Sequence, residues 1–518
     1  MSWEEEAEGI RRRRDAAQEQ GGAQAVERHH SLGRLTVRER IDLLTGGDFD
    51  EMGRMTGSGE VDDDGALVDF TPANYVLGTG RVGERRAVIG GEDFTLKGGS
   101  PNAAGLRKSV YSEDMALRYR LPLVRLLEGG GGSVAGTSGR KNAPVGEAVS
   151  QRPRFLSIAR VLSEVPVASA ALGPVAGFPA ARLAASHLSV MTRATASVMA
   201  AGPAVVERAL GIRLSKDALG GERIHRRSGL VDVIVEDEAA AMRALAEFLS
   251  YLPPSVHELP PRSECGDDPG RCEDELIRIV PRSRREPYDM RRLIAHIVDD
   301  GRFFEIGRHY GREQICALAR FDGHAAGVYA NDCRHFAGAM TAAAGQKARR
   351  FVDFCSTFHL PVVALVDQPG FMIGPEAEAA GTLRYGAAAI AAVMESPVPW
   401  CSVIVRKVFG VAGAAHFAPD AHVLAWPSAE SGALPVEGGV AVAFGREIAA
   451  ADDPKKRREE LEELLGRRQS SVFARGESFA YHDLIDPRET RPQICSWLRA
   501  VQPLMQSLKG PVRFGWRP

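Results

Sequence analysis

The chain repeats itself once, and this repeat restricts the fold more than any other feature of the sequence. Residues 98–128 (GGSPNAAGLRKSVYSEDMALRYRLPLVRLLE) align with residues 337–367 (AGAMTAAAGQKARRFVDFCSTFHLPVVALVD) at a constant offset of 239 positions, as from Gly99 to Gly338. Solenoid repeats are only roughly 20 to 50 residues long, so this period indicates a duplicated domain. A chain of 518 residues has room for two domains.

Each copy contains the same succession of predicted elements. A helical segment, 103–119 or 342–358, is followed by Leu-Pro and then by an apolar run, LVRLL or VVALV. This order predicts an α/β fold with buried, largely parallel strands. Each apolar run ends at an acidic residue and a Gly-rich turn, EGGGG or DQPGF. In α/β sheets ligands bind at such strand ends.

A second similarity follows in each half. Residues 173–177 (GPVAG) match residues 409–413 (FGVAG) in outline, so each half has two glycine-rich strand-to-helix junctions. The segment 256–290 is dense in Pro and charge and is predicted to be a linker. The first 55 residues are predicted to be helical, with a capping box from Thr36 to Glu39 in LTVRERIDLL.

Composition excludes several classes of protein. The net charge of −2 gives no general attraction to nucleic acid or to a membrane surface. The seven cysteines include no CxxC pair, and the spacing of Cys265 and Cys272 does not suit zinc, so we expect reduced thiols and no metal. The N-terminus lacks an apolar signal region, and the longest uncharged stretch, 165–181, is too short to span a membrane. We therefore expect a cytoplasmic protein.

The glycine-rich junctions allow three chemical interpretations. A Walker phosphate loop is excluded, because no Lys-Ser/Thr follows Gly132. The GxGxxG match at 78–83 is followed by a second strand candidate and no helix, which favours a β-hairpin over a dinucleotide site. The third interpretation is an oxyanion hole, in which backbone N–H groups stabilise a developing negative charge. No GxSxG or HExxH motif suggests a nucleophile or a metal, and the histidines considered are scattered: His225, His324, His335, His359 and His416.

From about residue 25 to the C-terminus the sequence resembles the carboxyltransferase (β) subunits of biotin-dependent acyl-CoA carboxylases, in particular propionyl-CoA carboxylase β. The resemblance rests on an ordered set of segments: LTVRERIDLL, GGEDFTLKGGS, LGGERIHRRSGLVD, FFEIGRHYGREQI, GQKARRFVDFCSTFHLPVVALVDQPGF, GTLRYGAAAIAAV, VIVRKVFG and AWPSAE. It implies two duplicated crotonase-like domains of the ClpP/crotonase superfamily, each a ββα superhelix. The expected division is a helical segment 1–55, an N-terminal domain 56–255, the linker 256–290 and a C-terminal domain 291–518.

The resemblance also implies an activity and partners. Such a subunit moves a carboxyl group from carboxybiotin to the α-carbon of an acyl-CoA, here propionyl-CoA or a larger acyl-CoA, and the ureido nitrogen of biotin takes the α-proton. The chain has no AMKM-like biotinylation sequence and no ATP-grasp region, so separate biotin carboxylase and biotin carrier subunits are expected. The family implies a homohexamer, a trimer of dimers, with active sites between the N-domain of one subunit and the C-domain of another.

Site residues follow from the family by position. The amides of Gly129, Gly130 and Gly131 are expected to hold the thioester oxygen as it becomes an enolate. The amides of Val411 and Ala412 are expected to hold the ureido oxygen of biotin. Further residues are expected to line the substrates: Gly410, Gly370 and Phe371 on the biotin side, Gly177, Phe178 and Arg140 on the CoA side, and Ala414 at the acyl group. The chain departs from the family's Asp-Ser-Gly-Gly-Ala-Arg at Glu128 and Gly132, and Val411 replaces a usual glycine.

Two other functions stay open at this point. The same subunit type can run in reverse, in a decarboxylase that passes carboxybiotin to a membrane pump. The altered LEGGGG and GVAG junctions also suit a non-catalytic scaffold subunit of a carboxylase complex. A biotin-free crotonase-type hydratase is disfavoured, since no Glu pair follows the junctions.

Overall fold

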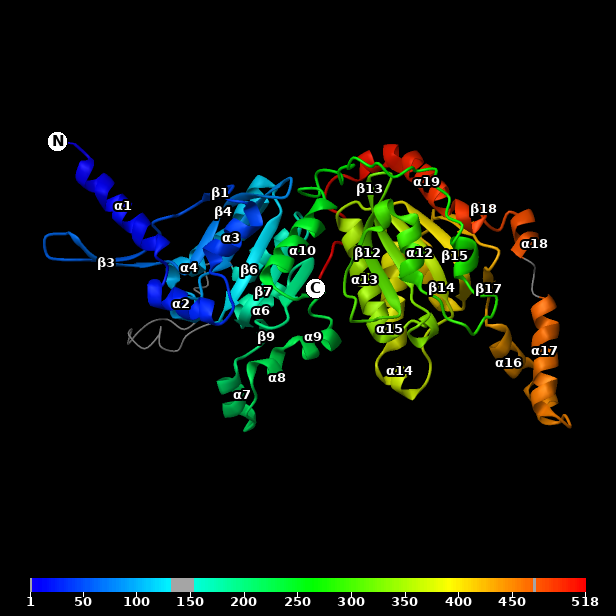
Figure 1. Ribbon diagram of the computed structural model, residues 1–518. Coiled ribbons are helices and arrows are strands. Elements are labelled where there is room, and N and C mark those ends of the chain that lie inside the picture. The colour runs from blue at the N-terminus through cyan, green and yellow to red at the C-terminus, as the bar shows by residue number, and fades with distance from the viewer. Residues whose placement is uncertain (1, 132–152, 469–471) are drawn as a thin grey trace. The chain divides into compact units, whose positions relative to one another are not determined.

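The computed structural model describes residues 2–131, 153–468 and 472–518 (Figure 1). Contacts along the chain divide it into two compact units. Unit 1 contains Met1–Glu258 together with Gly510–Pro518, and unit 2 contains Leu259–Lys509. Among the described residues, no helix has the length and apolar character needed to cross a membrane.

Unit 1 is built on a mixed eight-stranded sheet, whose path runs β1-β4-β5-β6-β7-β8-β10 with β9 beside β7. From β5 to β10 the neighbours are parallel. The strands are β1 (Phe49–Glu51), β4 (Tyr75–Val82), β5 (Arg85–Glu92), β6 (Leu123–Gly129), β7 (Val167–Ala176), β8 (Leu188–Thr192), β9 (Ser197–Met199) and β10 (Val233–Val235), with a separate hairpin of β2 (Gly57–Val61) and β3 (Leu67–Pro72). The helices are α1 (Glu4–Gln18), α2 (Ala23–Ser31), α3 (Val37–Thr45), η1 (Lys97–Gly99), α4 (Ala103–Tyr119), α5 (Arg154–Val161), α6 (Phe178–Ala184), α7 (Pro203–Leu210), α8 (Lys216–Gly220), α9 (Glu222–Ser228) and α10 (Glu238–Ser250).

Unit 2 has the same sheet topology, β11-β12-β13-β14-β15-β16-β18 with β17 beside β15. Its strands are β11 (Phe303–Glu305), β12 (Gln314–Phe321), β13 (His324–Asn331), β14 (Val362–Gln368), β15 (Trp400–Phe409), β16 (His422–Ala425), β17 (Glu430–Gly432) and β18 (Asp483–Leu484). The α-helices are α11 (Leu276–Ile279), α12 (Met290–Ile297), α13 (Ala342–Thr357), α14 (Pro375–Ala379), α15 (Thr382–Met394), α16 (Val436–Ala449), α17 (Pro454–Arg468), α18 (Val472–Glu477) and α19 (Thr490–Met505). The short 3-10 helices are η3 (Asp299–Gly301), η4 (Phe336–Gly338), η5 (Val411–His416), η6 (Pro487–Glu489) and η7 (Gln506–Leu508).

The duplication predicted from the sequence is confirmed at the level of individual pairings. Helices α4 and α13 begin at Ala103 and Ala342, which are 239 positions apart. The register between β6 and β7 breaks between Leu127 and Gly129, and that between β14 and β15 breaks between Val366 and Gln368, at the same offset. Every residue of β6 and β14 is buried, as the apolar runs predict for central parallel strands.

The second predicted similarity, GPVAG with FGVAG, is displaced by three residues, so that alignment was wrong. Strand pairing places Val167 opposite Leu123 and Trp400 opposite Val362, which makes Gly177 the counterpart of Gly410. Both glycines cap the following helix with positive φ, 66° and 63°. Glycine adopts this backbone conformation readily. Gly177 and Gly410 therefore correspond because they share this conformation and their strand register, whereas the shared sequence VAG is misleading.

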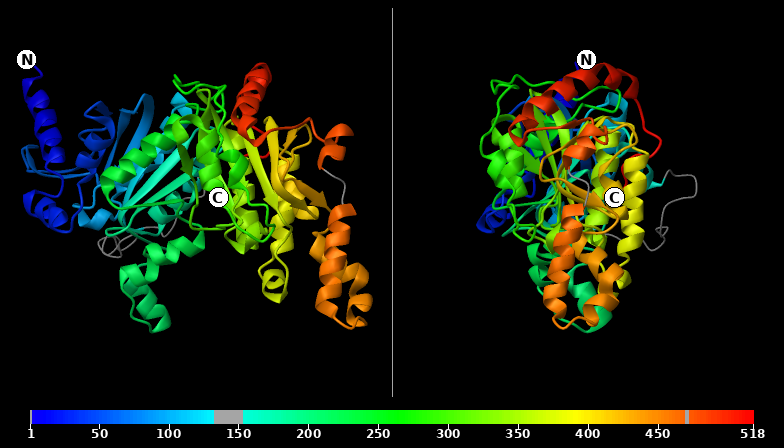
Figure 2. Two further views of the ribbon diagram at one scale, coloured as in Figure 1. Left: turned by 45° about the vertical axis from the view of Figure 1, so that its right-hand side comes forward. Right: turned by 90° about the vertical axis from the view of Figure 1, so that its right-hand side faces the viewer.

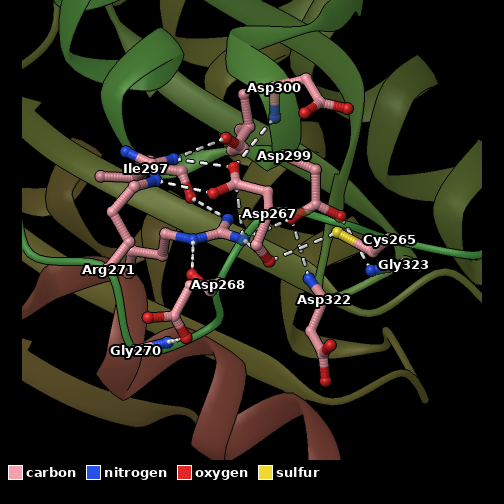
Figure 3. A network of polar contacts seen from close by, with 12 residues as sticks. Cys265, Asp267, Asp268, Gly270, Arg271, Ile297, Asp299, Asp300, Asp322 and Gly323 are labelled. Carbon is pink, nitrogen blue, oxygen red and sulfur yellow. Dashed lines mark hydrogen bonds and ion pairs between the residues drawn. The ribbon is translucent and has the colours of Figure 1, made fainter.

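The segment 256–290, predicted to be a linker, contains one short helix, α11, and is fastened to unit 2 by a polar network (Figure 3). Arg271 pairs with Asp267 at 2.8 Å, and Arg491 of α19 binds the Asp268 carbonyl and the Asp299 carboxylate. Leu276 is also buried in the core of unit 2. The division of the chain into two compact units does not test the domain boundaries expected from the sequence, which stay a prediction.

Two groups of helices extend away from the sheets. Figure 2 shows α7 and α8 projecting from unit 1, and α16 and α17 projecting from unit 2. Helix α7 buries none of its residues, although Val205 and Leu210 are apolar and 59% and 67% exposed. An apolar helix left in water is unfavourable, and such surfaces commonly mark sites of association.

The capping box is present as predicted. The Thr36 hydroxyl accepts from the Glu39 amide, and the Glu39 carboxylate accepts from the Thr36 amide at the start of α3. The GxGxxG match is a β-hairpin, as expected, because Gly78 and Gly80 lie within β4 and the turn to β5 forms at Gly83, where φ is 58°.

Candidate active site

The glycine run of unit 1 lies where two backbone segments touch. A Cβ atom on Gly131 would come within 2.8 Å of the Gly177 Cα and 2.9 Å of the Phe178 amide nitrogen. A Cβ on Gly99, at the end of η1, would come within 2.4 Å of the Glu128 carbonyl oxygen. Glycine is required here because any side chain would separate the end of β6 from the start of α6.

This contact brings two unpaired backbone donors together. Among the residues that the structure describes, the amides of Gly131 and Phe178 donate no hydrogen bond. The next residue, Pro179, has no N–H group. Adjacent free N–H groups on a fixed backbone can stabilise an oxygen that gains negative charge.

Unit 2 repeats the arrangement at β15 and η5. After Gly410 the amides of Val411 and Ala412 begin η5, and they too donate no hydrogen bond within the described part of the chain. Phe371, from the loop after β14, packs in one apolar cluster with Met340 and Ala412. The structure therefore brings together the predicted residues of each unit, Gly131 with Gly177 and Phe178, and Phe371 with Ala412.

The two junctions differ in the first loop. The Gly370 amide, at the position of Gly131 in the repeat, donates to Gln368 Oε1 at 3.0 Å. Gln368 in turn stands at the position of Gly129. Among the described residues, unit 1 thus offers the amides of Gly130 and Gly131 from the first segment and that of Phe178 from the second, whereas unit 2 offers two consecutive donors from η5 and none from Gly370.

Sequence reasoning left the acid at position 128 unexplained, and the structure accounts for it. Glu128 is fully buried, and its carboxylate contacts Arg34, Arg40 Nη1 at 2.6 Å and His29 at 3.5 Å. These partners come from the N-terminal segment that includes α2 and α3. Because a buried charge requires a partner, the N-terminal helices hold the end of β6 in place.

The equivalent acid of unit 2, Asp367, has a different partner. Its Oδ2 atom lies 3.0 Å from Arg406 Nη2, on the neighbouring strand β15. The position of Arg406 is occupied in unit 1 by Gly173, where a Cβ would come within 2.2 Å of Glu128 Oε1. The side chain of Glu128, which is longer than that of Asp367, fills this space. Its arginine partners, Arg34 and Arg40, come from the N-terminal segment and not from the neighbouring strand. The signal in the sequence was the pairing of Glu128 with Asp367 in the repeat.

The described titratable groups near the junctions do not include an evident general base. Burial lowers the pKa of His416, the last residue of η5, to about 3, so the imidazole is neutral and weakly basic near pH 7. Burial raises the pKa of Glu92, whose carboxylate accepts from the Glu128 amide at 3.3 Å. Within the described ranges, no three His, Cys, Asp or Glu side chains are placed to hold a metal ion.

The other predicted positions lie partly outside the described residues and partly in η5. Arg140 and the surplus glycine Gly132 lie outside the described residues. Ala414 is partly buried in η5. The side chain of Val411 is 69% exposed, and its N–H is retained, so the substitution of the usual glycine removes no donor.

The carboxyl transferase domain model matches residues 28–506. The chain belongs to the carboxyl transferase family. It is 31% identical to the propionyl-CoA carboxylase carboxyltransferase subunit of Haloferax mediterranei, over 97% of each chain. It is 29% identical to the methylmalonyl-CoA decarboxylase subunit alpha of Veillonella parvula, over 92% of each.

The structure is also similar to a solved one. The transcarboxylase 12S hexamer, with methylmalonyl-CoA bound, matches with a TM-score of 0.84 and 30% identity, covering 99% of this chain and 97% of the other. The predicted family, the duplicated crotonase-like fold and the enzyme class, an acyl-CoA carboxyltransferase, are confirmed. The roles of individual site residues stay predictions.

Proposed function

We propose that this chain transfers a carboxyl group from biotin on a separate carrier protein to the α-carbon of an acyl-CoA, with propionyl-CoA as the first candidate. The observation that carries the proposal is the pair of backbone junctions at equivalent places in the two halves, each with amides that donate no hydrogen bond to any described residue. The similarity to a propionyl-CoA carboxylase subunit supports the choice of acyl group.

In unit 1 the donors would act on the thioester. When the α-proton leaves, negative charge moves onto the thioester oxygen, and the amides of Gly131 and Phe178 would hydrogen-bond to it. Each such donor typically lowers a barrier by about 3 kcal/mol. The amides of Gly129 and Gly130 were expected to share this role. Gly129 ends β6 and pairs with Val175, so we propose that it positions the chain, while the amide of Gly130 stays a proposed donor.

The unit 2 junction fits the ureido group of biotin. A urea carbonyl oxygen accepts two hydrogen bonds, and η5 begins with two consecutive free amides, Val411 and Ala412. Gly410 sets their direction, and Gly370 and Phe371 would form the adjoining wall. Biotin, when bound, supplies the carboxyl group and a nitrogen that can take the α-proton. The low pKa of His416 is consistent with a protein that contributes no base of its own.

Residues further from the reacting atoms would select the substrate. Gly177 and Arg140 are proposed for the CoA side, and Ala414 for the acyl end. The side chain at Ala414 is a single methyl group, so the pocket would admit acyl chains larger than propionyl. The acyl-CoA panel described below tests this directly.

We further propose a homohexamer, a trimer of dimers, in which unit 1 of one subunit faces unit 2 of another. The similar transcarboxylase 12S core is a hexamer. The exposed apolar residues of the projecting helices, such as Val205 and Leu210 on α7 and Val442 on α16, would be covered by association. The partners would be biotin carboxylase and a biotin carrier protein, and the site of action the cytoplasm.

A coupled assay tests the function. The purified chain is mixed with a biotin carboxylase, its biotinylated carrier, ATP, labelled bicarbonate and acetyl-, propionyl-, butyryl- or longer acyl-CoA. We expect acid-stable label in a carboxylated product with propionyl-CoA or a longer acyl-CoA, and none without the chain. A chain that binds these acyl-CoAs but carboxylates none of them is a scaffold subunit, and the proposal is then wrong.

A decarboxylase is the second candidate, favoured by the similarity to methylmalonyl-CoA decarboxylase subunit alpha. The same two junctions would serve both directions, because the enolate is common to them. Complementation of a host lacking its own carboxylase separates the candidates. Growth on propionate supports the carboxylase direction, and failure to grow despite carboxyl transfer in vitro supports the reverse one.

A further inference from the structure

Unit 2 contains a strongly basic cavity outside the junctions. It has a volume of about 350 Å³ and is lined by Arg291, Arg308, His309, Arg312, Arg334 and His335. These residues come from three places: the start of α12, the segment 307–312 between β11 and β12, and the loop that follows β13. The volume lies within the roughly 300–1,000 Å³ range of small-molecule sites.

Two of the four arginines are held by carboxylates. Arg291 pairs with Glu305 and with Asp332. Arg334 pairs with Asp289 at 2.9 Å and with Asp332 at 3.1 Å. These contacts fix both guanidinium groups, and Asp332 is a partner of both. A fixed arginine loses little conformational freedom when it binds a ligand.

The other two arginines are held less closely. Arg308 is 63% exposed and its nearest carboxylate oxygen, on Glu305, is 3.7 Å away. Arg312 is exposed and has no ion pair or hydrogen bond with any residue that the structure describes. Burial lowers the pKa of His335 below its usual value, and the positive charge of Arg312 lowers it further. This second effect indicates that positive charge is in excess around His335.

We propose that this cavity binds the phosphate groups of a ligand, most simply a diphosphate. Arginine forks match phosphate oxygens in pairs, and the exposed guanidinium groups of Arg308 and Arg312 beside two fixed ones can hold two phosphate groups. The cavity residue His335 directly precedes η4, whose Gly338 approaches the end of β14: a Cβ on Gly338 would lie 2.9 Å from the Asp367 carbonyl oxygen.

The phosphate groups could belong to coenzyme A or to a free phosphorylated metabolite such as a nucleoside diphosphate. The inference does not depend on the proposed function, since phosphate binding requires no carboxyl transfer. Inorganic pyrophosphate contains the diphosphate group that both kinds of ligand share, so it is the probe for the site. Titrations with coenzyme A, dephospho-CoA and ADP then distinguish the coenzyme from a free phosphorylated metabolite.

The test is calorimetric titration of the full chain with pyrophosphate at a fixed salt concentration. We expect the double variant Arg308→Ser/Arg312→Ser to bind at least tenfold more weakly than the wild type. Arg499→Ser, a change at an exposed arginine of α19, is the matched control and should alter binding less than twofold. Both substituted arginines of the cavity are exposed, so thermal unfolding should be unchanged.

The remaining titrations assign the source. If the double variant weakens binding of coenzyme A and of dephospho-CoA alike, the cavity takes the diphosphate of the coenzyme; a larger effect on coenzyme A shows that the 3′-phosphate binds there. If it weakens pyrophosphate and ADP but leaves coenzyme A unchanged, the ligand is a separate phosphorylated molecule. The proposal is overturned if the wild type does not bind pyrophosphate, or if the double variant and Arg499→Ser behave alike.

Discussion

Arg40 Nη1 lies 2.6 Å from Oε2 of Glu128, the residue directly before the glycine run. The Arg40 and Glu128 side chains are 1% and 0% exposed, and Arg40 also binds Glu238 at the start of α10. This pair connects the N-terminal helix α3 to the end of the central strand β6. It explains why the chain carries a buried acid beside the glycine run.

Removing one partner of this pair should destabilise unit 1. Arg40→Met leaves Glu128 with Arg34 but takes from the buried Glu238 the arginine that binds it. A buried charge left without its partner typically costs about 3–5 kcal/mol, so we expect the free energy of unfolding to fall by this order. Urea unfolding followed by fluorescence and circular dichroism measures it. Arg86→Met is the control, since Arg86 and Asp50 form an exposed pair at 2.6 Å that should contribute less than about 1 kcal/mol. Equal losses in the two variants would contradict the role of Glu128.

Gly131→Ala should impair catalysis more than folding. The new methyl group would meet the Gly177 Cα at 2.8 Å and push the two donors of unit 1 apart. A misplaced donor costs about as much as a lost one, so we expect kcat to fall by roughly 10²-fold. Gly266→Ala, where nothing lies within 4 Å, is the control. Activity above a third of the wild-type value in Gly131→Ala would place the oxyanion hole elsewhere.

Val411 allows a donor to be deleted without breaking the helix. Proline is tolerated at the first position of a helix, where its missing N–H has no partner in the helix. We expect Val411→Pro to reduce kcat by about 10²–10³-fold, and Val411→Ala, which keeps the N–H, to change it less than threefold. Steady-state kinetics with saturating acyl-CoA compares them. A similar effect of both changes would assign the role to the side chain rather than the amide.

His416 gives unit 2 a specific sensitivity to acid. Its pKa is lowered by burial from 6.5 to about 3, so as the pH falls below 6.5 the unfolded chain takes up a proton that the folded chain does not. Stability from this group is therefore present above pH 6.5 and is lost towards pH 3, by at most about 1.4 kcal/mol per pH unit.

The measurement is the urea midpoint of the wild type and of His416→Gln at pH 7, 6 and 5. We expect the wild type to lose stability faster than the variant as the pH falls, whatever their difference at pH 7. The other titrating groups are common to both proteins and cancel in the comparison. Parallel decreases would show that His416 does not titrate differently on unfolding.

Much of the fold could be predicted because the repeat is local and periodic. The helix expected at 103–119 is α4, Ala103–Tyr119, and the one expected at 342–358 ends one residue earlier, at Thr357. The hairpin at Gly83 followed from the absence of a helix after the glycines. These features depend on residues that are close together in the chain.

Contacts between distant segments could not be predicted. The shared sequence VAG led to an alignment of Gly177 with Gly413, which was wrong. The true counterpart of Gly177 is Gly410, which shares its positive φ, and an amino-acid sequence does not show backbone dihedral angles. The arginines of Glu128 lie about 90 positions before it, at Arg34 and Arg40. The hydrogen bond from the Gly370 amide to the Gln368 side chain joins residues that are close in sequence. The sequence DQPGF nevertheless does not show whether the Gly370 amide forms this bond or stays unpaired.

The most direct test of the account is carboxyl transfer from methylmalonyl-CoA to free biotin by the purified chain alone. This reaction uses the two proposed backbone sites and needs neither carrier nor carboxylase partner. We expect propionyl-CoA formation that requires biotin and falls at least tenfold in both Gly131→Ala and Val411→Pro. The account is contradicted if biotin does not stimulate propionyl-CoA formation, or if both variants retain wild-type rates.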